Sequence, residues 1–205
     1  MGVLSLDDGF VFIHVPKTAG RSLAQVLQTR GPRFASMPDL VAASGDRAGI
    51  RHPNHLRARD VAAWLGPETW ARLYSFGLVR NPWDRMVSIY AFARQHRPHA
   101  RHAEARAVDF RGFVEASGRQ DLRPQSEWLC DAAGELMVSE VFRFEDLATA
   151  YPTILRRCGI GEPGAMPHEN VSKRTADYRG FYDNALAERV REAFAEDIER
   201  FGYSF

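Results

Sequence analysis

A short loop near the start of the chain carries side chains that bind anions. Lys17 supplies a cation, and Thr18 and Ser22 supply hydroxyl groups. The loop follows an almost unbroken apolar run, Phe10–Val15, and precedes residues 21–29, which have helical periodicity. A helix N-terminus behind a buried strand offers backbone N–H groups and the positive end of its dipole to an anion. We therefore expect a site for the phosphate or phosphosulfate end of a nucleotide.

The loop is not a Walker A motif, because GxxxxGK[ST] requires a glycine before the lysine, whereas Gly20 follows Lys17. Strand–loop–helix corners also occur in many α/β proteins as ordinary turns. The lysine is unusual for this chain, since only two of its 27 basic residues are lysines, Lys17 and Lys173. Lysine is a compact, rotatable point charge that suits a single transferring or bridging oxygen.

A second unit of the same kind follows. Tyr74–Val79 is an apolar run that predicts a strand, Arg80 stands at its C-terminal end, and a helix begins after a short turn. In open α/β sheets the carboxyl ends of neighbouring strands form the ligand crevice. Arg80 is therefore expected to reach the same ligand as Lys17, and Ser88, about two turns into the helix, to add a hydroxyl.

The remaining pattern predicts one α/β domain, residues 1–205, with a central, mostly parallel sheet flanked by helices. Helices are expected at 60–65, 67–73 and 109–116, after Pro124, at 145–158 and at 184–201, and short strands at 136–138 and 141–144. Asp183 or Asn184 is the expected N-cap of the last helix, and Gly202 ends it.

Composition narrows the function classes. The 205 residues are 45% hydrophobic, and 27 basic residues nearly balance 26 acidic ones, so nothing indicates a nucleic-acid partner. No apolar stretch reaches the ~20 residues of a transmembrane helix. The first nine residues lack signal-peptide features, which predicts a cytoplasmic protein. Cys130 and Cys158 are expected to be unpaired core thiols.

Two basic segments leave alternatives open. Residues 94–107 contain four Arg and three His around one Pro. They either contact an acidic acceptor or form a solvated, poorly ordered insertion. His99 and His102 alone do not make a zinc site, and no metal is expected. Lys173 and Arg174 end a polar loop that either closes over a nucleotide or is a solvated turn.

The two strand–loop–helix units together resemble a known family. Sulfotransferases that use 3′-phosphoadenosine 5′-phosphosulfate (PAPS) have a 5′-phosphosulfate loop similar to IHVPKTAGRSL and a 3′-phosphate motif similar to FGLVRNPWDRMVSIY. The resemblance is to the carbohydrate branch, which includes heparan and chondroitin sulfotransferases, in its short bacterial form. It continues through FRFEDL at 142–147, HENVSKR at 168–174 and DIERFGYSF at 197–205, and it fails at about 30–50 and 95–125.

The resemblance implies a P-loop-like sulfotransferase fold and a role for each matching residue. Lys17 would act in catalysis on the bridging and sulfonate oxygens, and Arg80 and Ser88 would bind the 3′-phosphate. His55 is similar to the branch's catalytic base, and His52 is the second candidate; a neutral imidazole suits removal of a hydroxyl proton. The other donor-binding positions would be Pro16, Thr18, Ala19, Gly20, Arg21, Ser22, Lys173 and Arg174.

The predicted reaction transfers a sulfonate group from PAPS to an acceptor hydroxyl by in-line displacement, without a metal, and leaves adenosine 3′,5′-bisphosphate. The family implies a carbohydrate hydroxyl, and the partner is expected to be a small-molecule or glycan acceptor. One alternative is a small-molecule kinase using ATP, which the missing Walker A order disfavours. Another is a nucleotide-binding regulator that has lost catalysis.

Overall fold

The computed structural model describes residues 2–28, 35–36, 55–118, 123–161 and 177–205. The chain folds into two compact units. The sheet unit comprises Met1–Val79 with Gln125–Glu169, and the helical unit comprises Arg80–Pro124 with Asn170–Phe205. The single domain expected from the sequence stays a prediction.

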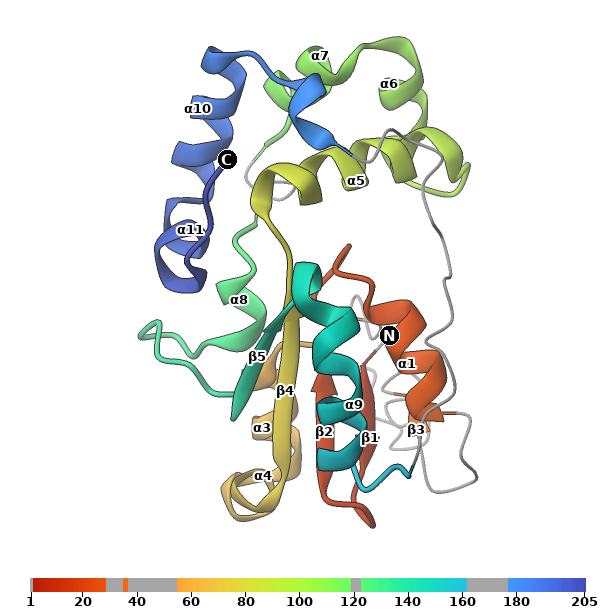
Figure 1. Cartoon of the computed structure of the whole chain (residues 1–205), viewed down its shortest axis with the longest axis vertical. Coiled ribbons are helices and arrows are strands. Elements are labelled where there is room, and N and C mark those ends of the chain that lie inside the picture. The colour runs from red at the N-terminus through yellow and green to blue at the C-terminus, as the bar shows by residue number, and fades with distance from the viewer. Residues whose placement is uncertain (1, 29–34, 37–54, 119–122, 162–176) are drawn as a thin grey trace. The chain divides into compact units, whose positions relative to one another are not determined.

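The sheet unit is built on five strands in the order β3-β1-β2-β4-β5 (Figure 1). β2, β4 and β5 are parallel neighbours, and β1 and β3 add an antiparallel edge. This confirms the predicted α/β fold with a mostly parallel sheet. The two strands that precede the predicted ligand-binding residues, β2 and β4, are neighbours in it. The strand bounds are β1 Val3–Ser5, β2 Phe10–Ile13, β3 Ala35–Ser36, β4 Tyr74–Val79 and β5 Glu140–Arg143.

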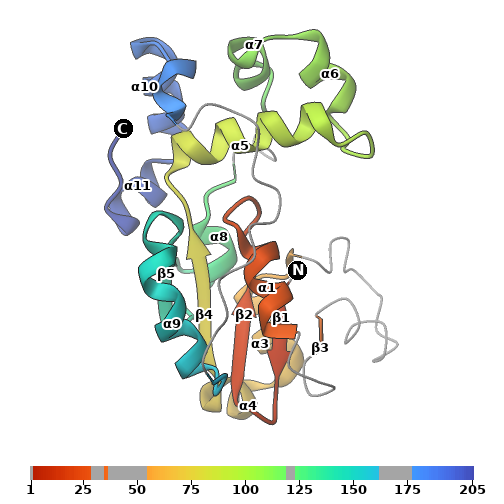
Figure 2. The same ribbon diagram turned by 45° about the vertical axis from the view of Figure 1, so that its right-hand side comes forward.

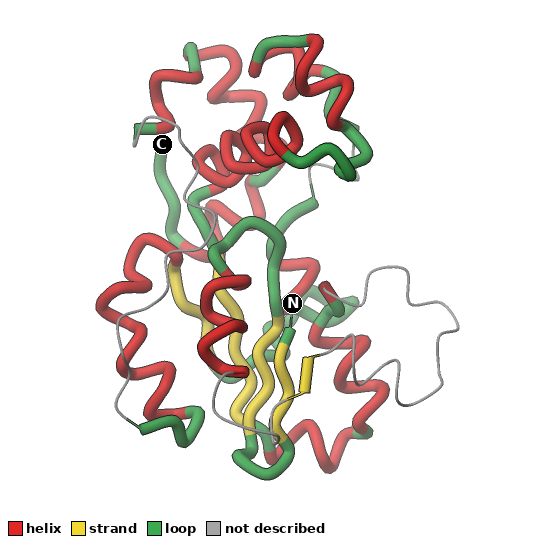
Figure 3. The backbone as a smooth tube through the Cα atoms, turned by 90° about the vertical axis from the view of Figure 1, so that its right-hand side faces the viewer, coloured by secondary structure: helices red, strands yellow, loops and turns green. Residues whose placement is uncertain are grey.

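Helices cover both faces of this sheet. α1 (Gly20–Gln28) and α9 (Leu147–Arg157) lie on one face, and α3 (Ala58–Leu65), α4 (Pro67–Arg72) and α8 (Ser126–Leu129) lie on the other (Figures 2 and 3). A short 3-10 helix, η2 (Phe144–Asp146), leads into α9. Alternate residues of β2 and β4 pack against α1 and α9, among them the fully buried Phe10, Phe12, Phe76 and Leu78.

The helical unit is built around α5 (Pro82–Gln95). Its N-cap is Asn81, whose Oδ1 accepts hydrogen bonds from the backbone N–H groups of Trp83 and Asp84. The other elements are α6 (His102–Ala107), α7 (Phe110–Glu115), η3 (Tyr178–Phe181), α10 (Asn184–Ala193) and α11 (Ala195–Phe201). α6, α7, α10 and η3 all contact α5, which is why polar residues of α5 are buried as well as its apolar stripe.

Two sequence-based expectations about secondary structure were wrong. The predicted strand at 136–138 is only an isolated bridge between Cys130 and Leu136. The predicted final helix is two helices, because the backbone of Phe194 leaves helical geometry (φ −120°, ψ 26°). Its caps are as predicted, since Asp183 accepts a hydrogen bond from Leu186 N and Gly202 adopts a left-handed conformation.

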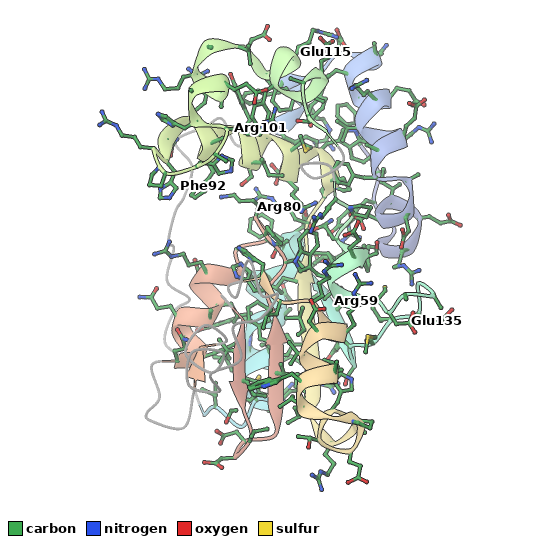
Figure 4. The ribbon with its side chains drawn as sticks, turned by 180° about the vertical axis from the view of Figure 1, so that it is seen from behind. Arg59, Arg80, Phe92, Arg101, Glu115 and Glu135 are labelled. Atoms are coloured by element: carbon green, nitrogen blue, oxygen red, sulfur yellow. The ribbon has the colours of Figure 1, made fainter. Side chains whose placement is uncertain are left out.

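Residues 94–107, for which the sequence left two alternatives open, form the end of α5, a turn and α6. Arg101 donates to both carboxylate oxygens of Glu104 and lies over the Phe113 ring, 3.8 Å from its centroid (Figure 4). His102 Nδ1 is 2.8 Å from the Ala93 carbonyl oxygen, so it donates to the last part of α5. These contacts fix the turn between α5 and α6.

The cysteine expectation is confirmed, because Cys130 and Cys158 are both buried and no disulfide joins them. Among the described residues, no helix is long and apolar enough to cross a membrane.

Candidate active site

The predicted anion loop lies between the end of β2 and the start of α1. Its threonine hydroxyl is used inside the loop, because Thr18 Oγ1 donates to the Val15 carbonyl oxygen at 2.9 Å and the side chain is fully buried. A hydroxyl has a single donor hydrogen. In this conformation the Thr18 hydroxyl braces the loop, and the donor-binding role of Thr18 stays a prediction.

Two residues of the loop have an uncommon backbone conformation. Lys17 has φ 69° and Ala19 has φ 62°, and neither is a glycine. Left-handed φ values in residues with a side chain cost about 1–3 kcal/mol each and cluster at ligand-binding sites. They also form part of the concave arrays of backbone N–H groups that bind anions. The loop therefore has two backbone features that anion-binding loops share, and its role as an anion site stays a prediction.

His55, the first candidate base, is held by two hydrogen bonds in the sheet unit. Its ring Nδ1 lies 3.0 Å from the backbone carbonyl oxygen of His14, and Trp128 Nε1 donates to the His55 carbonyl oxygen at 3.2 Å. A carbonyl oxygen can only accept, so Nδ1 carries the hydrogen. In the neutral ring the lone pair is then on Nε2, the atom that would take a proton from an acceptor.

His14 is a residue that sequence reasoning missed. It directly follows β2, its side chain is buried at 7% exposure, and its ring centroid is 4.5 Å from that of His55. The sequence did contain a signal, because His14 is the single polar residue in an otherwise apolar run next to the lysine loop. The apolar pattern around it led to its interpretation as an ordinary strand residue.

In the helical unit, Arg80 forms an ion pair with Asp84, four residues later in the chain. Arg80 Nε and Nη2 both reach Asp84 Oδ2, at 2.7 and 2.6 Å, and each side chain is only about a tenth exposed. Ser88, buried at 8% exposure, follows at the next i+4 position, so all three side chains share one face of the helix start. Asp84 was also missed, although its spacing from Arg80 was visible in the sequence.

A second arginine lies deeper in the same unit. Arg85 is fully buried, donates from Nη1 to the Arg123 carbonyl oxygen at 2.9 Å and lies over the Phe194 ring. Burial lowers the pKa of Arg85 to about 10; the carboxylate of Asp197 opposes this shift, and the nearby charge of Arg80 adds to it. The guanidinium therefore remains charged at neutral pH and adds to the positive potential at Arg80.

Three of the predicted site residues, His52, Lys173 and Arg174, lie outside the described residues. Ser22 is buried in the first turn of α1 and Arg21 is exposed there, beside Gly20. Within the described part of the chain, no cluster of three or more His, Cys, Asp or Glu side chains could hold a metal ion.

A parallel sheet with a strained, lysine-containing loop before a helix is typical of α/β proteins that bind phosphate groups. Comparison with known proteins assigns the family. A model of the sulfotransferase family matches residues 3–204, and the chain belongs to that family. A search of curated proteins found no match.

A similar fold is found in a crystal structure described as mouse sulfotransferase SULT7A1 complexed with PAP. The TM-score is 0.54 at 15% sequence identity, and the match covers 94% of this chain and 85% of the mouse chain. At this identity the likeness concerns the fold. It confirms the predicted sulfotransferase fold.

Proposed function

We propose that the protein transfers a sulfonate group from PAPS to a hydroxyl group of a carbohydrate acceptor, with His55 as general base. One observation carries the proposal: His55 Nδ1 is bonded to the carbonyl oxygen of His14, the residue that opens the Lys17 loop. The contact connects a base of defined tautomer to the proposed sulfonate-binding loop. Membership in the sulfotransferase family and the PAP in the mouse structure support PAPS as the donor.

Each end of the donor would be bound by one of the two strand–loop–helix motifs. Lys17 and the backbone N–H groups of the loop would hold the 5′-phosphosulfate, while Arg80 and Ser88 would hold the 3′-phosphate. Asp84 would keep the guanidinium of Arg80 oriented, as it does in the structure. The remaining proposed donor-binding positions are Pro16, Thr18, Ala19, Gly20, Arg21 and Ser22 in the loop, and Lys173 and Arg174.

The reaction balances without a further reactant. The acceptor oxygen attacks sulfur as its proton passes to His55 Nε2, and the sulfur–oxygen bond to the 5′-phosphate breaks with its electron pair on the leaving oxygen. Lys17 would offset the charge that develops there. The His14 carbonyl oxygen, which accepts from Nδ1, stabilises the imidazolium that forms. The product nucleotide is adenosine 3′,5′-bisphosphate.

Donor identity is tested by ligand binding in EDTA. We expect adenosine 3′,5′-bisphosphate to raise the melting temperature and 5′-AMP to raise it much less, because 5′-AMP lacks the 3′-phosphate. Protection only by ATP with magnesium would instead favour the small-molecule kinase. Lysozyme treated in the same way serves as the control for nonspecific anion effects.

Acceptor identity is tested by a screen of glycans and small alcohols with radiolabelled PAPS. We expect label to move to a carbohydrate hydroxyl and to require Lys17. Transfer only to non-carbohydrate alcohols would overturn the carbohydrate part of the proposal. The alternative of a non-catalytic regulator predicts that the protein binds the nucleotide but transfers no sulfonate. It also predicts that the cellular effect of the protein survives Lys17→Ala and His55→Ala. The cytoplasmic location stays a prediction, testable by fractionation of the native host cells.

A further inference from the structure

His14 is an unusual residue for its place in the sheet unit. It follows the buried strand β2, and its ring stacks on Phe12 with 5.9 Å between centroids. Among the residues that the structure describes, no group hydrogen-bonds to its buried Nδ1 atom. Buried polar atoms without a partner are rare and lower stability. An apolar ring at this position would avoid that loss, so space filling alone does not account for the histidine.

One edge of the His14 ring lies against the start of α1. A Cβ atom built on Gly20 would be 2.6 Å from His14 Nε2 and closer still to Cδ2, where real Cβ atoms essentially never come within 3.0 Å. Gly20 has no positive φ that would by itself call for glycine. The glycine is therefore required by the close approach of the helix to the His14 ring.

A further neighbour of the His14 ring is the proposed base. The rings of His14 and His55 are 4.5 Å apart between centroids and tilted by 49°. The His14 backbone holds the same base, through its carbonyl oxygen at 3.0 Å from His55 Nδ1. A single residue thus contacts His55 through both its main chain and its ring, while its ring also supports the first residue of α1.

We infer that His14 is a positioning residue for the proposed base: its ring, packed between Gly20 and His55, keeps the His55 ring against the His14 carbonyl oxygen beside the sulfonate-binding loop. The inference rests on the proposed function for its catalytic consequence. His14 itself touches no reacting atom. Without the ring, His55 would lose its packing neighbour and would rotate away from the carbonyl, which selects its tautomer.

A double-mutant cycle tests whether His14 acts through His55. Single-turnover sulfonate transfer and binding of adenosine 3′,5′-bisphosphate are measured for His14→Ala, His55→Ala and the double variant. We expect His14→Ala to slow transfer by about 10- to 100-fold, as expected for a catalytic group displaced by about 1 Å. Nucleotide affinity should change less than about threefold, and His14→Ala should cause no further loss in the His55→Ala background. Equal losses in both backgrounds would overturn the inference.

Nitrogen NMR of the histidine rings gives a readout that does not depend on transfer. The wild-type protein should show His55 as one tautomer with hydrogen on Nδ1, and His14→Ala should show a mixture of tautomers. An unchanged His55 spectrum would overturn the inference even if the protein proved to have another activity. Absence of both nucleotide binding and transfer in the wild type would instead count against the proposed function alone.

Two further variants complete the test. His102→Ala removes a comparable Nδ1–carbonyl contact, to Ala93, and should alter neither the His55 spectrum nor transfer. Gly20→Ala pushes on the same ring from the other side, so it should produce the His55 tautomer mixture without deleting His14. Added to His14→Ala, it should cause no further spectral change, because its Cβ then has room. A Gly20→Ala protein with the wild-type His55 spectrum would contradict the packing on which the inference depends.

Discussion

Gly77 in β4 lies against α8, the helix whose Trp128 donates a hydrogen bond to the His55 carbonyl oxygen. A Cβ atom built on Gly77 would be 3.3 Å from Leu129 Cδ1 and less than 3.0 Å from Cδ2. Leu129 is fully buried in α8, and its neighbour Trp128 donates to the His55 carbonyl oxygen. Gly77→Ala is therefore expected to push α8 away from the sheet and to disturb His55.

The size of the effect follows from two opposing contributions. Ordinary Cβ contacts begin at 3.4 Å. The Leu129 methyl must therefore move by about 1 Å, and overpacking of this kind costs about 1–3 kcal/mol. Replacing glycine in a strand gains about 0.5–1 kcal/mol through the unfolded state. We expect a net loss of roughly 0.5–2 kcal/mol in the free energy of unfolding. We also expect transfer to slow by about tenfold or more through displacement of His55.

Urea denaturation measures the stability change, and single-turnover transfer measures the catalytic one. Leu129→Val removes the δ-methyl groups, so the cost of Gly77→Ala should shrink in that background. The reasoning would be refuted by a Gly77→Ala protein with wild-type stability and activity. A stability cost that is the same in the Leu129→Val background would refute the steric argument.

Three other changes have defined outcomes. Arg80→Ala, made together with Asp84→Asn so that no buried carboxylate loses its counter-ion, should weaken adenosine 3′,5′-bisphosphate by about 10- to 100-fold and 5′-AMP hardly at all. If calorimetry shows the same loss of affinity for both nucleotides, Arg80 does not recognise the 3′-phosphate and has a structural role. Trp128→Phe deletes the donor to His55 and should slow transfer by up to about tenfold at constant nucleotide affinity. Burial, with a smaller contribution from Asp8, raises the pKa of Cys158 from 9.0 to about 12. The folded state then keeps a proton that the unfolded state loses, so stability should fall by about 1 kcal/mol between pH 9 and 10. Urea denaturation at the two pH values measures this change, and the free energy of unfolding of Cys158→Ala should fall by about 1 kcal/mol less than that of the wild type.

Much of the fold was predictable because its signals are local. The apolar runs that became β2 and β4 each end at a cation-bearing turn, and a helix follows each one. The short strand β1 was not predicted, since three residues give too little periodicity. A clue was present in Gly9, which has φ 70° in the turn between β1 and β2 and follows an aspartate.

The parts of the site that depend on distant contacts were not predictable. His55 was proposed from a motif, yet its tautomer depends on a carbonyl group 41 residues away and its backbone on an indole 73 residues away. His14 was read as part of a strand, because its contacts with Gly20 and His55 arise only in the folded sheet unit. The break at Phe194 likewise interrupts an apolar period that one straight helix would satisfy equally well.

The most direct test of the account is single-turnover transfer of labelled sulfonate from PAPS to the acceptor identified by screening, in EDTA. We expect the wild-type protein to form one labelled product and one adenosine 3′,5′-bisphosphate per turnover. His55→Ala should slow this step by about 10²- to 10⁴-fold, the usual contribution of a general base, while nucleotide binding persists. Failure of PAPS to donate sulfonate to any hydroxyl, or an undiminished rate in His55→Ala, would contradict the account.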